Sequence, residues 1–148
     1  MGGGMGGEPR WYEVSNVDDV ASPALLLYPD RIGENVRRMI RVAGGPERLR
    51  PHVKTHKTAE IVTLQMRQGI GRFKCATIAE SEMVAACGAP DVLLAMQPVG
   101  PSVPRLLALI RAFPTTRFAA IVDSDLVVES LAQAASAAGV EPGVVLDV

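Results

Sequence analysis

The chain alternates between short apolar runs and longer stretches with helical spacing, and this alternation constrains its fold more than any other feature. The apolar runs are typical of strands buried on both faces. The stretches between them place apolar side chains on one stripe, as Ile32, Val36 and Ile40 do. The predicted strands are residues 24–28, 49–54, 72–77, 91–95, 117–122 and 144–148, with a helix after each of the first five. Such regular alternation indicates an α/β fold with parallel strands joined by right-handed crossovers.

Two architectures fit this order of elements: an open doubly wound sheet and a (β/α)8 barrel. The periodicity alone does not separate them. Residues 144–148 end the chain inside an apolar strand pattern, so we expect the N-terminal portion of a longer protein. Residues 11–148 are predicted to form one unit without an internal boundary. Residues 1–10 are rich in glycine and are predicted to be a disordered tail.

Composition excludes several classes of function. The net charge is −1 and basic residues form no block, which argues against a nucleic-acid partner. No apolar run approaches the roughly 20 residues that span a bilayer, so no membrane partner is expected. Two cysteines do not form a disulfide framework, and we expect a cytoplasmic protein.

The segment Arg50–Lys57 is the main indication of chemistry. Read as a strand, it places Arg50, His52 and Lys54 on one face, with Lys54 at the carboxyl end. Carboxyl ends of parallel strands form the active site in both candidate architectures. A lysine there is a candidate nucleophile that forms a Schiff base with a carbonyl compound, of which pyridoxal phosphate is the commonest cofactor example. The alternative is an ordinary solvated lysine in a loop.

Four further residues are predicted to contact the cofactor or to orient groups around it. His52 is placed to touch the cofactor or tune the amine, although a buried, fully hydrogen-bonded histidine is an equal alternative. Arg50 lies deeper, and Asp147 on the last strand is a candidate partner for it. Thr77 and Gln97 follow strands at the active edge, but Thr77 also fits a helix cap and Gln97 a loop hydrogen bond.

A metal site within this chain is not predicted. His52, His56, Cys75 and Cys87 contain no paired CxxC, and their spacings match no standard structural zinc site.

The segment RPHVKTHKT, residues 50–58, resembles the cofactor-lysine motif of the D-threonine aldolase and D-serine dehydratase family. These are fold-type III pyridoxal phosphate enzymes, related to alanine racemase through its N-terminal barrel. Residues 22–39, 73–84 and 91–100 resemble further parts of the family, so the resemblance covers residues 11–148. It implies a partial (β/α)8 barrel of the alanine racemase N-terminal type, with about five βα units and a sixth strand.

The resemblance also implies a function. Lys54 is similar to the family's cofactor lysine, while Lys57 is expected to have a positioning or surface role. The implied activity is a lyase acting on D-amino acids, with D-threonine converted to glycine and acetaldehyde; residues 96–100 favour this branch. The alternatives are conversion of D-serine to pyruvate and ammonia, or a non-catalytic pyridoxal phosphate homeostasis protein. We expect a homodimer and a divalent metal whose ligands lie outside this chain, and therefore no activity from these residues alone.

Overall fold

The computed structural model describes residues 10–147, which form a parallel α/β structure. The helices are α1 (Pro29–Ala43), α2 (Ala59–Arg67), α3 (Ile78–Ala86), α4 (Ser102–Ala112) and α5 (Asp125–Ala138). The strands are β1 (Arg72–Cys75), β2 (Asp91–Leu94), β3 (Arg117–Val122) and β4 (Gly143–Leu146). Short 3-10 helices occupy Val17–Asp19, Pro46–Arg48 and Val53–Thr55. Nine of the ten residues of the predicted tail lie outside the described part of the chain.

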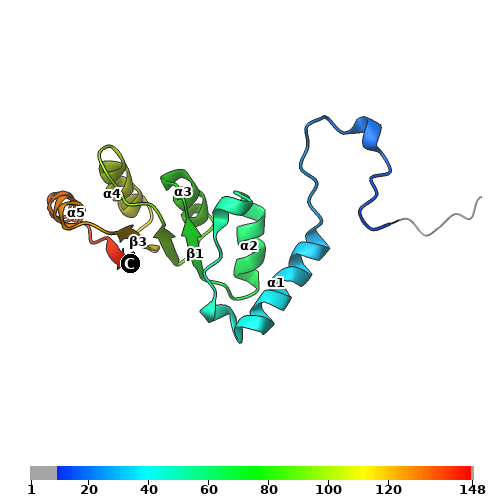
Figure 1. Ribbon diagram of the computed structural model, residues 1–148, viewed down its shortest axis with the longest axis horizontal. Coiled ribbons are helices and arrows are strands. Elements are labelled where there is room, and N and C mark those ends of the chain that lie inside the picture. Colours follow the sequence, from blue (N-terminus) through cyan, green and yellow to red (C-terminus); the bar gives the residue numbers. More distant parts are fainter. Residues whose placement is uncertain (1–9, 148) are drawn as a thin grey trace, which may run out of the picture.

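The four strands form one parallel sheet in the order β1-β2-β3-β4, and a helix connects each strand to the next. Figure 1 shows α3, α4 and α5 in a row along one side of the strands. This arrangement follows from parallel pairing, because the chain must run back along the sheet, here as a helix, before the next parallel strand begins.

The core lies between the sheet and these helices. Alternate strand residues are buried on the helix side, including Phe73 on β1, Val92 on β2 and Phe118 on β3. They pack with helix residues such as Val84 and Leu109. Strand residues of the opposite face, such as Leu93, stay only partly covered. The helices therefore bury one face of the sheet and leave the other accessible.

Sequence signals at the helix ends explain most of the boundaries. α1 begins at Pro29, whose missing N–H is not needed in the first turn. It ends before Gly44, which adopts a φ of +80° and donates its N–H to the carbonyl of Ile40. Thr77 caps α3, and its Oγ1 accepts the Glu80 N–H at 3.1 Å. The helix cap expected of Thr77 is thus present, and the Glu80 carboxylate accepts from Ala76 N rather than from Thr77 N as a full capping box would require.

Two predicted strands are not formed as expected. Residues 24–28 have no strand partner among the described residues, and Leu25 remains 78% exposed. Figure 1 shows this lead-in segment running away from the sheet beyond α1. An apolar run without a neighbouring ladder cannot satisfy its backbone groups as a strand, so the prediction of a strand at residues 24–28 is wrong for this structure.

The second predicted strand, residues 49–54, is reduced to one parallel bridge between His52 and Lys74. Pro51 has no N–H to donate, so only its carbonyl joins the ladder, accepting from Lys74 N at 2.9 Å. The His52 side chain then accepts the Lys54 N–H and the chain turns into the 3-10 helix Val53–Thr55. Lys54 therefore lies on a turn, and the expectation that it shares a strand face with Arg50 and His52 is wrong.

One negative finding concerns membranes. Between residues 10 and 147, no helix combines the length and the apolar character that crossing a bilayer requires.

Candidate functional site

Lys54 lies in a turn that we call the lysine loop, residues 53–58, next to the edge strand β1. Val53 is fully buried and its carbonyl accepts the N–H groups of His56 at 3.0 Å and Lys57 at 2.8 Å. This buried anchor leaves Lys54 and Thr55 exposed to solvent. Because the loop follows the bridge to β1, it emerges at the carboxyl edge of the sheet. No ion pair engages the Lys54 ammonium within residues 10–147.

His52 positions the backbone of Lys54. Its Nδ1 accepts the Lys54 N–H at 3.2 Å. Burial lowers the pKa of His52 below its ordinary value of 6.5, and the positive charges of Lys54 and Lys74 lower it further. The ring is therefore neutral near pH 7, and a neutral imidazole is what an Nδ1 acceptor requires. The structure shows His52 as an acceptor for the Lys54 backbone, while contact with a cofactor or an effect on the amine stays a prediction.

His56 and Thr58 hold the other end of the lysine loop. His56 Nδ1 accepts the Thr58 N–H at 3.1 Å, and Thr58 Oγ1 donates to the His56 carbonyl at 2.6 Å. Burial lowers the pKa of His56 as well. Its Nε2 is buried and has no hydrogen-bond partner among the described residues. Two neutral imidazoles, one before and one after Lys54, thus hold the loop by accepting its backbone N–H groups.

Arg50 lies at the opposite edge of the sheet from the lysine loop. Its guanidinium donates to Asp91 Oδ1 at 2.5 Å and to the Phe73 carbonyl at 3.4 Å. Asp91 is the first residue of β2, so this pair marks the amino edge. The expected pairing of Arg50 with Asp147 is wrong, since Asp91 takes that place. A contact between Arg50 and a cofactor stays a prediction, and the ion pair gives the residue a structural role.

Thr77 and Gln97 both line a cavity of about 470 Å³ at the carboxyl ends of β1 and β2. Gln97 Oε1 accepts the Asp123 N–H at 2.8 Å, which ties the loop after β2 to the loop after β3. Thr77 Oγ1 is engaged as the α3 cap. The alternatives noted from sequence, a helix cap and a loop hydrogen bond, are therefore both present. Cofactor contact by these two residues stays a prediction.

Sequence reasoning missed Glu80 as a site residue. Its side chain is only 5% exposed, its Oε2 accepts the Ala76 N–H at 2.7 Å, and its Oε1 lies 3.7 Å from Lys57 Nζ. The spacing of Thr77 and Glu80 fits a capping box, which accounts for Glu80 only as part of a helix start. Nothing in the local sequence shows that its carboxylate reaches back under the lysine loop.

Cys75, at the carboxyl end of β1, provides no thiolate at this edge. Burial raises the pKa of the Cys75 thiol to about 11, so it stays protonated at neutral pH. Cys87 is partly buried, and its Sγ lies 3.7 Å from the Ala59 carbonyl. In the described part of the chain, no cluster of three or more His, Cys, Asp or Glu side chains is arranged to hold a metal ion.

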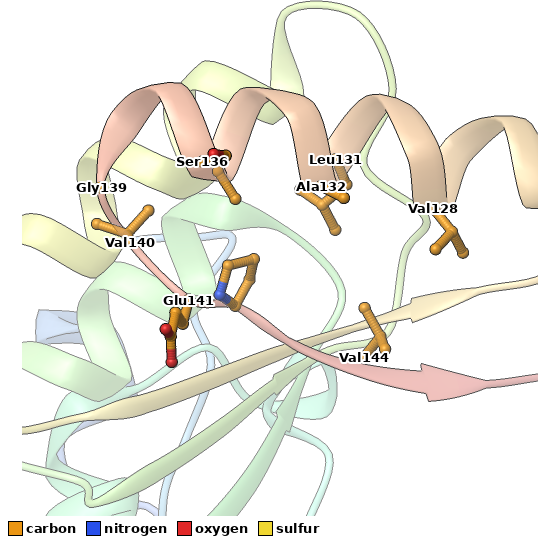
Figure 2. A pocket seen from close by; sticks show the side chains of 10 residues that line it. Val128, Leu131, Ala132, Ser136, Gly139, Val140, Glu141 and Val144 are labelled. Atoms are coloured by element: carbon orange, nitrogen blue, oxygen red, sulfur yellow. The ribbon is translucent and has the colours of Figure 1, made fainter.

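A larger cavity, about 660 Å³, lies away from this site between α5 and β4. Figure 2 shows Val128 and Leu131 of α5 directed toward Val144 of β4 across it. Its lining is mostly apolar, with Glu141 as its one acidic side chain. β4 is at the far end of the sheet from β1, so this cavity is separate from the lysine loop. Size alone therefore does not identify the reactive site.

Comparison with known proteins identifies the family of this chain. The profile of a family described as "Alanine racemase, N-terminal domain" matches residues 28–148. The chain belongs to this family. The α/β fold with parallel strands and the likeness to a partial barrel, both expected from the sequence, are confirmed.

Individual relatives point the same way. A D-threo-3-hydroxyaspartate dehydratase from Delftia sp. (strain HT23) is 33% identical over 130 residues, covering 86% of this chain and 32% of the relative. A D-threonine aldolase from Arthrobacter sp. is 28% identical over 130 residues, covering 87% of this chain and 34% of the relative. The crystal structure of D-threonine aldolase from Filomicrobium marinum matches with a TM-score of 0.77 and 32% identity, covering 88% of this chain and 35% of that one.

These relatives confirm the resemblance to fold-type III pyridoxal phosphate enzymes that residues 50–58 indicated. The chain spans about a third of the length of the curated relatives it matches.

The side chains of the lysine loop fit such a cofactor. A carbonyl cofactor requires a primary amine that is accessible and free of a competing carboxylate. Lys54 meets both conditions, and His52 and Val53 fix its backbone.

Proposed function

We propose that this chain supplies the cofactor lysine and part of the barrel of a pyridoxal phosphate-dependent lyase acting on D-amino acids. The observation that supports it most directly is Lys54, which is exposed at the carboxyl edge with a fixed backbone and no carboxylate partner among the described residues. The names of the relatives, an aldolase and a dehydratase for D-configured hydroxy amino acids, support the same class of activity.

Each residue of the lysine loop has a task in this proposal. Lys54 Nζ would hold the cofactor, which acts as an electron sink when a bond at the substrate breaks. His52 holds the Lys54 backbone while staying neutral, so it adds no third positive charge beside Lys54 and Lys74. Val53, buried under the loop, keeps the amine at the edge of the sheet rather than folded onto it. Thr77 and Gln97 line the adjoining carboxyl edge, where polar groups are available to a ligand.

The specific reaction that we propose is a D-threonine aldolase, which produces glycine and acetaldehyde. The fold match to a D-threonine aldolase at 32% identity supports it. Dehydration of a D-configured β-hydroxy amino acid, such as D-serine, is the second candidate, because the dehydratase relative is 33% identical. Both reactions begin at the same lysine and differ in the substrate bond that breaks.

Two parts of the proposal involve residues outside this chain. We propose that a divalent metal near the substrate hydroxyl takes its ligands from elsewhere in the protein, and that the active form is a homodimer. Dependence of turnover on added Mn²⁺ after chelation, and the mass in solution, test these two points.

The decisive experiment is chemical trapping at the lysine. The protein as expressed from its gene is mixed with pyridoxal phosphate, reduced with borohydride, digested and analysed by mass spectrometry. We expect the pyridoxyl group on Lys54, loss of that label in Lys54→Arg, and its retention in the matched control Lys57→Arg. Label scattered over exposed lysines, or none at all, would contradict the proposal.

Turnover then separates the candidate activities. D-threonine, D-serine and D-threo-3-hydroxyaspartate are supplied in turn, with L-threonine as the enantiomer control. Glycine and acetaldehyde from D-threonine would support the aldolase, and a keto acid with ammonia the dehydratase. A labelled Lys54 without turnover of any of them would indicate a non-catalytic cofactor-binding protein.

A further inference from the structure

We propose that Glu80 determines which of the two lysines in the loop reacts with pyridoxal phosphate, by holding Lys57 away from the reaction. The inference rests on the proposed function of Lys54 and extends it to a positioning residue. The two amines are only three positions apart in the chain and both side chains are exposed. A pair of neighbouring surface lysines needs some structural difference if only one of them is to react.

The first part of that difference is the fixed position of the Glu80 carboxylate. It is 5% exposed, and its Oε2 accepts the Ala76 N–H at 2.7 Å. The Glu80 backbone N–H is held by Thr77 Oγ1 at 3.1 Å. Glu80 is therefore attached to the carboxyl end of β1 and the first turn of α3, and it provides a rigid negative charge beside the loop.

The second part is the contact with Lys57. Lys57 Nζ lies 3.7 Å from Glu80 Oε1, an oxygen that is buried and has no hydrogen-bond partner within the described residues. A buried carboxylate oxygen without a hydrogen bond has a strong requirement for a cation. Lys57 is the one cation within ion-pair distance of it in the described part of the chain.

The third part is the backbone of Lys57. Its φ is +50°, a left-handed conformation that non-glycine residues seldom adopt, and its N–H is tied to the Val53 carbonyl at 2.8 Å. Such a conformation costs free energy and persists only when the surroundings hold it. We infer that the left-handed turn directs the Lys57 side chain toward α3, while Lys54 on the 3-10 turn pairs with no carboxylate between residues 10 and 147.

This arrangement has a chemical consequence. In the reaction with the cofactor, the lysine ammonium would first lose one proton to solvent, and the neutral amine nitrogen would then attack the aldehyde carbon. A C=N bond would form while the carbonyl oxygen leaves as water together with the two remaining amine protons. Lys57 must break its ion pair before it can attack, and this would leave a buried carboxylate uncompensated. Lys54 breaks no such contact. Glu80 thus lowers the reactivity of Lys57 relative to Lys54 without touching the cofactor.

The test is the ratio of labels on the two lysines, read by mass spectrometry after brief reaction with pyridoxal phosphate and borohydride reduction of the C=N bond. In Glu80→Gln the amide oxygen can still accept from Ala76 N, but the charge beside Lys57 is lost. We expect the ratio of Lys57 to Lys54 label to rise about threefold or more, the lower bound being typical of an ion pair whose lysine is as exposed as Lys57. Glu82→Gln, a change on the exposed side of the same helix, is the matched control and should leave the ratio unchanged.

A second variant separates this role from a purely structural one. In Lys57→Gln the competitor is absent, so adding Glu80→Gln to it should not change the rate of Lys54 labelling. If Glu80→Gln lowers Lys54 labelling equally with and without Lys57, Glu80 acts through the fold and the inference is overturned. An unchanged ratio in the single variant overturns it as well.

The wild-type protein provides a test that does not depend on any variant folding. Salt screens an ion pair whose lysine is 65% exposed, so the share of label on Lys57 should rise between low and high NaCl. A share that does not respond to salt would overturn the inference. Wild-type label mainly on lysines other than Lys54 at low salt would instead contradict the proposed function, so the two failures are distinguishable.

Discussion

Two regions of this protein contain similar apolar runs, which are buried in one region and exposed in the other. In the central region, β1 to β3, Phe73 and Val92 are fully buried and Phe118 is 4% exposed. In the peripheral segments, residues 24–28 and β4, Leu25 is 78% exposed and Leu146 is 70% exposed. Strand pairing explains part of the difference. β2 and β3 have neighbours on both sides, β4 pairs only with β3, and residues 24–28 pair with nothing in the described structure.

An apolar run therefore joins the hydrophobic core only where other elements cover it. Helix α3 and helix α4 lie against the central strands, whereas the cavity between α5 and β4 leaves Val144 uncovered (Figure 2). Exposed apolar strands of this kind are the surfaces through which chains associate.

The largest expected loss of stability is that of Phe73→Ala, and Leu26→Ala is its counterpart in the peripheral region. Phe73→Ala removes a fully buried ring and should lower the free energy of unfolding by about 3–5 kcal/mol. Leu26→Ala, at 47% exposure, should change it by less than about 0.5 kcal/mol. Urea unfolding of both variants measures the difference. Similar losses would show that residues 24–28 are covered in the protein as expressed, and the contrast between the regions would fail.

The next effect concerns the ion pair that attaches the segment before the lysine loop to the central region. Arg50→Met leaves Asp91, which is 19% exposed, without its nearest cation and should cost about 1–3 kcal/mol. Arg117→Met is the control, because Arg117 is 77% exposed and 4.0 Å from the same carboxylate. Its cost should stay below about 1 kcal/mol. Equal losses in the two variants would refute a special role for the Arg50 contact.

A smaller effect distinguishes two helix caps. Thr77→Ala removes the bond to Glu80 N at the start of α3 and should cost about 1 kcal/mol. Ser124→Ala at the start of α5 removes no side-chain capping bond and should cost less than about 0.5 kcal/mol. Thermal unfolding of the pair, followed by circular dichroism, provides the comparison. A larger loss at Ser124 would mean that the periphery depends on a contact that this structure does not contain.

The smallest expected effect is a pH dependence from the lysine loop. The pKa values of His52 and His56 are lowered in the folded state, so the unfolded chain binds their protons more readily. Their contribution to stability is complete above their ordinary value of 6.5 and is lost as pH falls below it. Denaturant unfolding at about pH 8 and about pH 5 should show this loss. A variant with both residues changed to Asn should show a flatter profile, and an unchanged profile would exclude the two imidazoles as its source.

Much of the fold could be predicted from local patterns. The five helices lie between the predicted strands, and the ends of β1, β2, β3 and β4 agree with the predicted ranges to within two residues. Gly44 and Gly139 end their helices with positive φ, as expected of glycine after a helical stretch. These signals succeed because periodicity and capping act over a single helical turn or a few strand residues.

The predictions that the structure contradicts depend on contacts between distant parts of the chain. Residues 24–28 have strand composition, but a strand also needs a ladder partner from elsewhere in the chain. Pro51 interrupts the second predicted strand because it has no N–H to donate, and an alternating pattern of side chains does not register that loss. Asp147 is a candidate partner for Arg50 because both lie on predicted strands, whereas the folded sheet brings Asp91 to Arg50 from 41 positions away.

The sequence by itself determined the α/β order and the resemblance to the family to which the chain belongs, and it singled out Lys54 as the candidate cofactor lysine. Only the tertiary structure decided which apolar runs are buried, which carboxylate Arg50 meets, and that the buried Glu80 lies beneath Lys57 rather than Lys54. The physical reason is the separation along the chain over which each kind of interaction acts. Backbone propensities and caps depend on neighbouring residues, while burial and ion pairing depend on segments that come together only when the chain folds.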